Sequence, residues 1–274
     1  MNGIVFLNGT FLPQRDARVS ILGPGFLYGW GLFETMRSYH SAIPYLDGHL
    51  KRLIGSCRAL DIRRPVSLSG LKQSIHKTVR VNRLTDAYVR LTVSKAEQGA
   101  DILIMAKKYR PYSSRKYSQG FSACVGEFHQ SENSFLASHK TTNYLFYRLN
   151  LLGAQTKGFD EALILNNRGY VTEGSRSNVF LVKEGSLFTP SLDCGCLAGI
   201  TRMAIFDLAR RYHIKICEGN FTTQDLYSAD EVFLTNSLMG IMPLASLGQK
   251  KVGNKTRTLT LFLRKKYHRL FYGI

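Results

Sequence analysis

The heptapeptide Ser138-His-Lys-Thr-Thr-Asn-Tyr144 is the stretch on which the fold and the function of this chain depend most. It places Lys140 after a loop of small polar residues and directly before an amphipathic run. An average lysine is a solvated surface charge, and Lys140 taken alone fits that description. A lysine that is desolvated and directed into a cleft acts instead as an amine that captures an electrophile. The heptapeptide leaves both interpretations open, so the flanking segments have to decide between them.

The segment after the heptapeptide predicts a helix and then a strand-rich block. Leu145, Leu149, Leu152 and Ala154 recur at helical spacing. Apolar runs separated by turn residues then predict strands at 161–166, 170–173, 178–183 and 186–189. A further helix is expected after Gly199-Ile-Thr201, and a basic helix over residues 256–271.

Upstream of the heptapeptide, the pattern predicts a smaller group of strands and helices. Two short apolar runs flank Asn8-Gly9, which is a strong hairpin signal. Asp47 is expected to cap a helix with a buried apolar stripe, and Arg52 lies off that stripe. Arg52 is therefore either a surface charge or the counter-charge of a bound anion.

Residues 87–94 alternate between apolar and polar side chains, which is typical of a half-buried strand. One face carries Ala87, Val89, Leu91 and Val93, and the other carries Tyr88, Arg90 and Thr92. The second face is unusually polar for a strand inside a core. We therefore expect it to line a cleft.

These elements predict an α+β or α/β protein of two domains. The 274 residues are ample for a buried core. Residues 111–119 are polar, contain Pro111 and lack periodicity, so we expect a linker there. The expected domains are a small N-terminal α/β domain at 1–110 and a larger C-terminal domain at 120–274.

Composition excludes several classes of protein and leaves one alternative open. Hydrophobic content of 44% and charged content of 20% are those of an ordinary globular chain. No apolar run reaches the length of a membrane span and no signal peptide is evident, which predicts a cytoplasmic protein. The five cysteines lack zinc-ligand spacing, so we expect reduced thiols and no metal. The net charge of +18 makes nucleic-acid binding a remote alternative, although no nucleic-acid-binding motif is present.

Three later segments supply what a lysine needs in order to carry a phosphorylated pyridine cofactor. Glu173 lies between two expected strands, where an acid can hold a pyridine nitrogen in its protonated form. Gly199-Ile-Thr201 opens a helix, whose free N–H groups and positive dipole end attract anions. Asn236-Ser237 ends a strand and offers further donors. Together with Lys140 and Arg52, these segments describe an enzyme that uses pyridoxal 5'-phosphate (PLP).

The same motifs resemble the class IV aminotransferase-like enzymes of fold type IV, which include D-amino acid aminotransferase, branched-chain aminotransferase and 4-amino-4-deoxychorismate lyase. The resemblance covers nearly the whole chain. Its most specific pieces are Phe33-Glu34, His49-Leu-Lys-Arg52-Leu53, Lys140-x-x-Asn143, Glu173-Gly-Ser-x-Ser177-Asn178, Gly199-Ile-Thr-Arg202 and Phe233-Leu-Thr-Asn236-Ser237. The order of the six pieces makes the resemblance specific, because each alone would be weak.

The resemblance implies a two-domain fold with the cofactor between the domains, in a homodimer whose partner subunit helps to wall the site. It implies that Lys140 is the Schiff-base lysine and proton carrier, and that Glu173 is the partner of the pyridine nitrogen. The residues expected to bind the cofactor beside these two are Arg52, Tyr144, Ser177, Asn178, Gly199, Ile200, Thr201, Asn236 and Ser237. Phe33, Tyr88 and Arg90 are expected to contact the substrate.

Two departures from the aminotransferase pattern favour the lyase. Branched-chain aminotransferases usually carry a glycine pair after the lysine, whereas Thr141-Thr142 follows it here. Gly240 stands where aminotransferases often have a glutamate. Phe33-Glu34 and Tyr88-x-Arg90 also occur in aminotransferases, so a branched-chain or D-amino acid aminotransferase stays the alternative.

The expected reaction converts 4-amino-4-deoxychorismate to 4-aminobenzoate and pyruvate, a step of folate biosynthesis. Lys140 is expected to remove the ring proton next to the substrate nitrogen. By resemblance, Thr35 is expected to donate a proton to the leaving enolpyruvyl group. The guanidinium of Arg90 is expected, from its own chemistry, to clamp a carboxylate.

Overall fold

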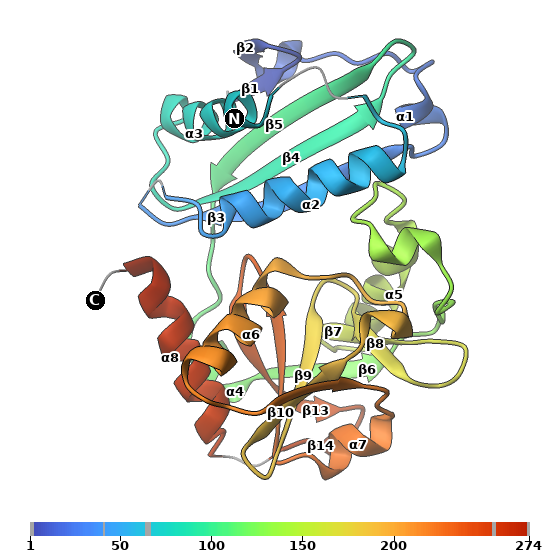
Figure 1. Ribbon diagram of the computed structural model, residues 1–274, viewed down its shortest axis with the longest axis vertical. Helices are drawn as coiled ribbons and strands as arrows, with labels where there is room; N and C mark the ends of the chain where they lie inside the picture. Colours follow the sequence, from blue (N-terminus) through green and yellow to red (C-terminus); the bar gives the residue numbers. More distant parts are fainter. Residues whose placement is uncertain (1–2, 41, 64–66, 254–255, 273–274) are drawn as a thin grey trace. The chain divides into compact units, whose positions relative to one another are not determined.

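The computed structural model describes residues 3–40, 42–63, 67–253 and 256–272, and its chain divides into two compact units (Figure 1). The first unit comprises residues 1–110 and 139–143, and the second comprises residues 111–138 and 144–274. Lys140 therefore belongs to the first unit, although its position in the sequence placed it in the expected C-terminal domain.

The first unit contains a five-stranded antiparallel sheet in the order β2-β1-β5-β4-β3. Its strands are β1 (Ile4–Leu7), β2 (Thr10–Pro13), β3 (Gly31–Ser38), β4 (Ala87–Lys95) and β5 (Ala100–Lys108). Asn8 and Gly9 join the first two strands with φ values of 50° and 97°. Both residues are left-handed, as a tight hairpin turn requires, so the predicted hairpin is confirmed.

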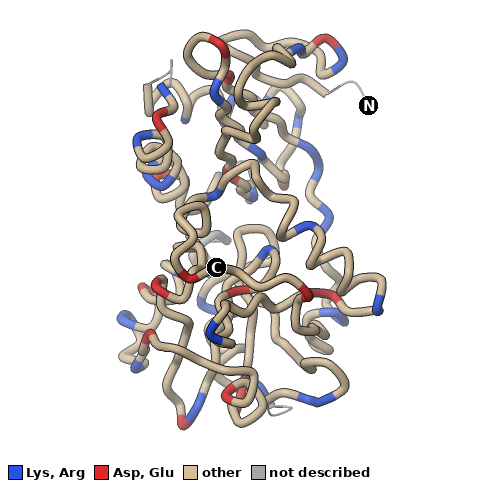
Figure 2. The backbone as a smooth tube through the Cα atoms, turned by 90° about the vertical axis from the view of Figure 1, so that its right-hand side faces the viewer, with Lys and Arg blue, Asp and Glu red and all other residues tan. Residues whose placement is uncertain are grey.

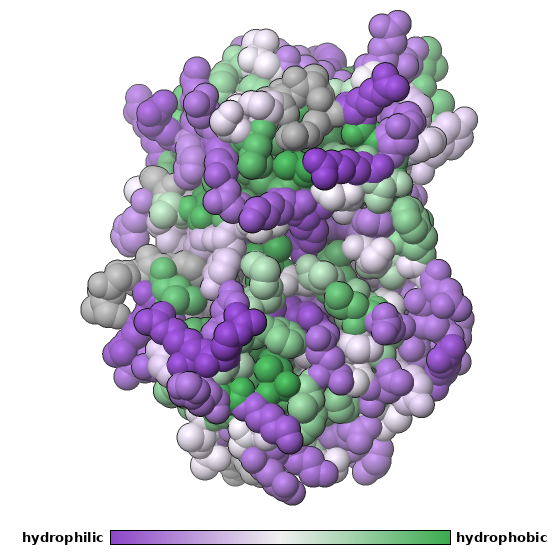
Figure 3. Space-filling model, viewed as in Figure 1, coloured by the Kyte–Doolittle hydropathy of each residue, from purple (hydrophilic) through white to green (hydrophobic). Residues whose placement is uncertain are grey.

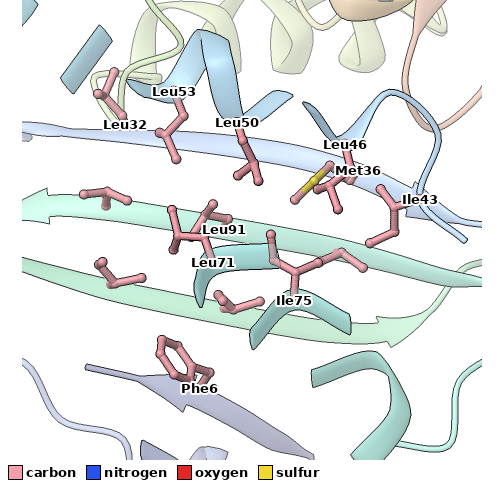
Figure 4. Close-up of a cluster of buried hydrophobic side chains, with 14 of the residues drawn as sticks. Phe6, Leu32, Met36, Ile43, Leu46, Leu50, Leu53, Leu71, Ile75 and Leu91 are labelled. Carbon is pink, nitrogen blue, oxygen red and sulfur yellow. The ribbon is translucent and has the colours of Figure 1, made fainter. Parts of the chain in front are cut away.

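Helices α2 (Leu46–Ala59) and α3 (Leu68–Val81) cover one face of this sheet (Figure 1). The core beneath them includes Met36, Leu50, Leu71, Ile75 and Leu91, all essentially inaccessible (Figure 4). The short elements η1 (Gln14–Asp16) and α1 (Pro24–Leu27) complete the unit. The helices leave the opposite face of the sheet for other contacts.

The start of α2 corrects one prediction from the sequence. Tyr45, rather than Asp47, occupies the N-cap position, with a left-handed backbone at φ 52° and no side-chain cap. Asp47 lies in the first turn and forms an ion pair with Lys72 of α3. An acidic residue in the first turn still complements the positive end of the helix dipole, which explains why the pattern pointed to it.

The second unit contains a nine-stranded mixed sheet in the order β11-β10-β9-β12-β13-β6-β7-β8, with β14 paired to β13. Its strands are β6 (Phe121–Val125), β7 (Glu161–Leu165), β8 (Val171–Gly174), β9 (Asn178–Lys183), β10 (Ser186–Pro190), β11 (Ile216–Gly219), β12 (Glu231–Asn236), β13 (Gly240–Leu247) and β14 (Lys250–Lys251). Strand β8 ends the order and yet also contacts β9 and β10. The sheet therefore curls back on itself.

Five α-helices surround this sheet: α4 (Ser114–Gln119), α5 (Leu145–Thr156), α6 (Ile200–Arg211), α7 (Thr223–Ser228) and α8 (Thr258–Tyr272). The 3-10 turns η2 (Phe135–Ser138) and η3 (Leu192–Cys194) lie in the connections. Buried Glu231 accepts the backbone N–H groups of Leu259 and Thr260 and so caps α8.

The stretch 111–119, expected as a linker, is largely helical. The Ser113 side chain accepts the N–H of Lys116 and caps α4. Tyr117 on this helix is buried, and its hydroxyl donates to the Met239 carbonyl at 2.7 Å. These contacts make residues 114–119 part of the second unit, because a polar segment with one anchoring aromatic residue packs as a helix.

Lys and Arg are distributed over both units (Figure 2). The face shown in Figure 3 is mostly hydrophilic, with patches of exposed hydrophobic side chains. In the part of the chain that the structure describes, no helix has the length and apolar character needed to cross a membrane.

Candidate active site

The backbone of residues 140–142 is hydrogen-bonded to the beginning of β3. Phe33 N–H donates to the Lys140 carbonyl at 2.8 Å, and Thr142 N–H donates to the Gly31 carbonyl at 2.8 Å. The Thr142 hydroxyl and the Asn143 side-chain amide both donate to the Gly29 carbonyl. Lys140 is therefore held by β3 and by the turn before it.

Phe33 lies in contact with two cations. Its ring centroid is 4.4 Å from Lys140 Nζ and 3.8 Å from Arg90 Cζ. Both contacts have the geometry of cation–π interactions. Because both distances start at the same centroid, Nζ and Cζ are no more than about 8 Å apart. The structure thus brings together Lys140 and two of the residues expected to contact the substrate.

Thr35 and Tyr88 lie on the same face of the sheet as Phe33 and Arg90. Thr35 is paired directly with Arg90, and Arg37 with Tyr88. The alternation predicted for β4 is confirmed: the four apolar side chains are buried, whereas Tyr88, Arg90 and Thr92 are partly exposed. This face is the one that α2 and α3 do not cover.

Arg52 is paired with Glu34 and is not a solvated surface charge. Its Nε and Nη2 donate to the Glu34 carboxylate at 2.8 and 2.6 Å, and His49 Nδ1 lies 2.7 Å from Oε2. Burial alone would raise the pKa of Glu34, but the charge of Arg52 and the hydrogen bonds from His49 and Arg52 lower it to about 2. Glu34 is therefore an ionised, buried carboxylate.

Glu34 and His49 were missing from the expected site residues. A signal for them was present, because His49 and Arg52 are three residues apart and so share a helix face. Glu34 also alternates with Phe33 and Thr35, which sends its side chain to the helix-covered face of the sheet. The sequence motif contained both residues, but nothing in it showed that they meet.

The low pKa of Glu34 predicts how stability depends on pH. Its folded pKa of about 2 lies below the ordinary value of 4.5, so its contribution is complete above about pH 4.5 and is lost as the pH falls toward 2. We expect Glu34→Gln to lower the free energy of unfolding near neutral pH by about 3 kcal/mol. Urea titrations at several pH values should show that the free energy of unfolding of this variant falls less steeply toward acidic pH than that of the wild type. The exposed control Asp16→Asn should leave this pH dependence unchanged, and an equal effect of both variants would contradict the assignment.

In the second unit, Glu173 on β8 is the centre of a buried hydrogen-bond network. Its carboxylate accepts the Tyr147 hydroxyl at 3.0 Å, the Leu197 N–H at 3.2 Å and the Asn178 amide at 3.4 Å. Only 5% of Glu173 is exposed. These contacts fix the direction in which the carboxylate points.

Tyr144 and Tyr147 stack on each other at the start of α5, with ring centroids 5.1 Å apart. Tyr144 donates to the Ser175 carbonyl at 2.7 Å. Burial, followed by the charge of Glu173, raises the pKa of both phenols, so both stay protonated donors. Tyr147 was missed from the sequence, although its spacing of three residues from Tyr144 places both on one side of the helix.

Ser177 bonds to a buried carboxylate that the sequence did not single out. Its hydroxyl donates to Glu161 Oε2 at 3.0 Å, and the Ser175 hydroxyl bonds to Oε1 of the same residue. Glu161 is fully buried, and burial raises its pKa. Both serines of the Glu173–Asn178 motif thus anchor the loop to β7. Asn178 instead bonds to the Leu197 carbonyl and to Glu173.

The N-terminus of α6 has the features of an anion site. Gly199 is the N-cap, and Ile200 and Thr201 form the first turn. Among the described residues, the buried Thr201 Oγ1 has no hydrogen-bond partner. A Cβ on Gly199 would lie 1.9 Å from Asn178 Oδ1, so only glycine fits there. A helix end with free N–H groups and an unsatisfied hydroxyl suits a phosphate group.

Asn236 organises the turn after β12. Its side-chain amide donates to the Arg176 carbonyl at 3.0 Å, and its Oδ1 accepts the N–H groups of Leu238 and Met239. Asn236 therefore shapes the backbone around Ser237. The first unit offers an amine on Lys140, and the second offers an oriented carboxylate on Glu173 and an unpaired hydroxyl at a helix N-terminus; these are the kinds of group that a phosphorylated pyridine requires.

Comparison with known proteins shows the family of this chain. The model of the family described as Amino-transferase class IV matches residues 31–247. The chain is 33% identical to a putative branched-chain-amino-acid aminotransferase of Methanocaldococcus jannaschii, covering 96% of this chain and 94% of that protein. It is 30% identical to an aminodeoxychorismate lyase of Bacillus subtilis, covering 96% and 93%. Among solved structures, a T.th. branched-chain amino acid aminotransferase with pyridoxamine 5'-phosphate superposes with a TM-score of 0.94 at 27% identity, covering 100% and 95%.

Proposed function

Because this chain belongs to the amino-transferase class IV family, and is therefore a PLP enzyme of fold type IV, we propose that it is a lyase of folate biosynthesis. Its substrate is 4-amino-4-deoxychorismate, and its products are 4-aminobenzoate and pyruvate. The family and the fold expected from the motifs are confirmed. The choice between a lyase and an aminotransferase rests on particular residues of this chain.

The position of Arg90 supports a substrate that carries a carboxylate, although Tyr88-x-Arg90 also occurs in aminotransferases. Its guanidinium stacks on Phe33 within about 8 Å of the Lys140 amine, and no described Asp or Glu forms an ion pair with it. Beside the ring of Phe33, this face presents the polar groups of Thr35, Tyr88 and Arg90. A substrate with an amine and a carboxylate several bonds apart matches these groups better than a branched aliphatic substrate does.

The observation that carries the choice of the lyase is Gly240, and the similarity to a known lyase supports it. Gly240 adopts a left-handed φ of 67° and lies so close to Tyr267 that a Cβ there would be 3.1 Å from its ring. A glutamate, as in many aminotransferases, would be strained at this position. The similarity to the B. subtilis lyase extends over 96% of the chain.

The roles of the cofactor-binding residues follow from their chemistry. When bound, PLP supplies an electron sink for the carbon next to the substrate nitrogen. Lys140 would hold the cofactor through its amine, and the Glu173 carboxylate would keep the pyridine nitrogen protonated. Thr201, the N–H groups of the α6 N-terminus, Ser237 and Arg52 would hold the phosphate. Tyr144, Ser177, Asn178 and Asn236 would shape these surroundings.

The chain's own groups then move two protons. The Lys140 amine removes the proton from the ring carbon that bears the substrate nitrogen. The Thr35 hydroxyl donates a proton to the enolpyruvyl group as its C–O bond breaks, which gives pyruvate. Loss of this group and of the ring proton leaves an aromatic ring. Arg90 holds a substrate carboxylate during both steps, and Phe33 and Tyr88 form the wall beside it.

The aminotransferase alternative keeps Lys140 and Glu173 in the same roles and differs in where the proton returns. It is favoured by the 33% identity to the M. jannaschii protein. The deciding experiment supplies purified enzyme with 4-amino-4-deoxychorismate and no keto acid, and follows 4-aminobenzoate and pyruvate by chromatography. We expect equal amounts of the two products. No product, together with conversion of PLP to its amine form by an L- or D-amino acid, would establish an aminotransferase.

We also propose that the chain forms a homodimer. Leu145, Leu149 and Leu152 lie on one side of α5 and are exposed, as are Ile21, Phe26 and Tyr28 in the first unit. Exposed apolar stripes of this kind mark interaction surfaces. Sedimentation velocity should show a species of twice the 30.9 kDa chain mass, and Leu145→Lys/Leu149→Lys should shift it to the monomer. A wild-type monomer at micromolar concentration would refute this assignment.

A further inference from the structure

The face of the first-unit sheet that α2 and α3 do not cover carries a second cation, Lys107, beside Arg90. Lys107 on β5 is paired with Tyr88 on β4, and its Nζ lies 5.0 Å from the centroid of the Tyr88 ring. The side chain is therefore folded over this face and does not extend past the end of the strand. Within the described ranges, neither Lys107 nor Arg90 forms an ion pair with an acid.

The acidic groups nearest in the sheet are occupied or distant. Arg37, in the same row as Tyr88 and Lys107, is neutralised by Asp86 through contacts of 2.9 and 2.7 Å. Asp101 shares the face of Lys107 but lies six residues along β5, about 20 Å away, where it accepts from Asn8. Glu34 points to the opposite face. Two positive charges therefore remain available on this surface.

The rows of the sheet fix the order of the groups on this face. Phe33 pairs with Thr92, Thr35 with Arg90, and Arg37 with Tyr88, in successive rows about 7 Å apart. Lys140 Nζ and the Arg90 guanidinium both lie over Phe33 in the first row, and Lys107 Nζ lies over Tyr88 in the third. Met105, the β5 partner of Arg90, occupies the second row.

We propose that Lys107 forms, with Arg90, a subsite for a substrate that carries two carboxylates. This inference rests on the proposed function and deepens it, because 4-amino-4-deoxychorismate has one carboxylate on its ring and one on its enolpyruvyl group. Arg90 takes one of them and Lys107 takes the other, while the ring lies against Met105 and Phe33. Lys107 thereby selects dicarboxylate over monocarboxylate ligands, through charge and with no part in proton transfer.

The test compares Lys107→Met with Lys108→Met. Lys108 is the next residue of β5 and is also exposed, but strand alternation places it on the opposite face. The probes are chorismate and 4-hydroxybenzoate. Chorismate has two carboxylates and a hydroxyl in place of the reactive amine. 4-Hydroxybenzoate is its counterpart without the enolpyruvyl group. Binding of each to the PLP-loaded enzyme is measured by calorimetry, with thermal unfolding as a check on the fold.

We expect Lys107→Met to weaken chorismate binding about fivefold and to leave 4-hydroxybenzoate within twofold. Added salt should reduce the difference. With 4-amino-4-deoxychorismate, KM should rise while kcat stays the same. Unchanged chorismate affinity, or an equal loss in Lys108→Met, would overturn the inference. If no 4-aminobenzoate is formed but chorismate binding still depends on Lys107, the subsite stands and the proposed reaction fails.

Discussion

Lys140→Ala is expected to lower turnover at least about 10³-fold, which is the largest effect of any single substitution in this chain. The proposed reaction requires the amine twice, first to hold the cofactor and then to remove the ring proton. Lys107, also on this face, stands two rows further along the sheet, over Tyr88, and is not placed to replace it. The loss should appear in kcat more than in KM, because the proposed substrate contacts of Arg90 and Phe33 are kept.

A chemical label separates the role of Lys140 from damage to the fold. Borohydride added to the wild-type holoenzyme should attach the cofactor irreversibly to the peptide that contains Lys140, as detected by mass spectrometry. Lys140→Ala should show no labelled peptide, and a small primary amine in the buffer should restore part of its activity. Lys51→Ala removes an exposed lysine from α2 in the same unit and should behave as wild type. Labelling at any other lysine would refute the assignment of Lys140.

The fold was predictable where a local rule determined it. Asn8-Gly9 fixes a hairpin because both residues accept a left-handed backbone, and the alternation over 87–94 fixes which side of β4 is buried. The expected linker was not predictable in this way. Tyr117 makes its helix part of the second unit through a contact with Met239, more than a hundred residues away, and no local pattern reports such a contact.

For the site residues, too, local features were predictable and contacts between distant residues were not. Motif order proposed Lys140, Arg52, Glu173, Ser177 and the start of α6 as site residues, because the chemistry of each is visible in its residue type. The buried partners of Arg52 and Ser177 were missed, since each partnership joins distant positions. Glu34 meets Arg52 only when β3 packs beneath α2, and Ser177 meets Glu161 only when the loop after β8 folds over β7. Spacing shows which side chains share an element, but not what they face across the core.

The second large effect is expected at Glu173. Glu173→Gln keeps the size of the side chain and one of its two acceptor oxygens but removes the negative charge. An amide cannot hold a pyridine nitrogen in its protonated form, so the bound ring becomes a poorer electron sink. We expect kcat to fall about 10²-fold or more, with a small change in the affinity for PLP, because the phosphate contacts are untouched. Stopped-flow and steady-state assays of 4-aminobenzoate formation measure the first quantity, and titration of the apoenzyme measures the second.

The buried network around Glu173 provides graded controls for this experiment. Tyr147→Phe removes one donor at 3.0 Å while leaving the carboxylate charged, so it should cost less than about tenfold in kcat. Glu184→Gln neutralises an exposed carboxylate in the turn between β9 and β10 and should have no effect. The absorption spectrum of the bound cofactor should change in Glu173→Gln and stay as in the wild type in Glu184→Gln, because only Glu173 is expected to face the ring. If Glu173→Gln retains kcat within twofold, another group must keep the pyridine nitrogen protonated, and the carboxylate that Tyr147, Asn178 and Leu197 orient has a structural role alone.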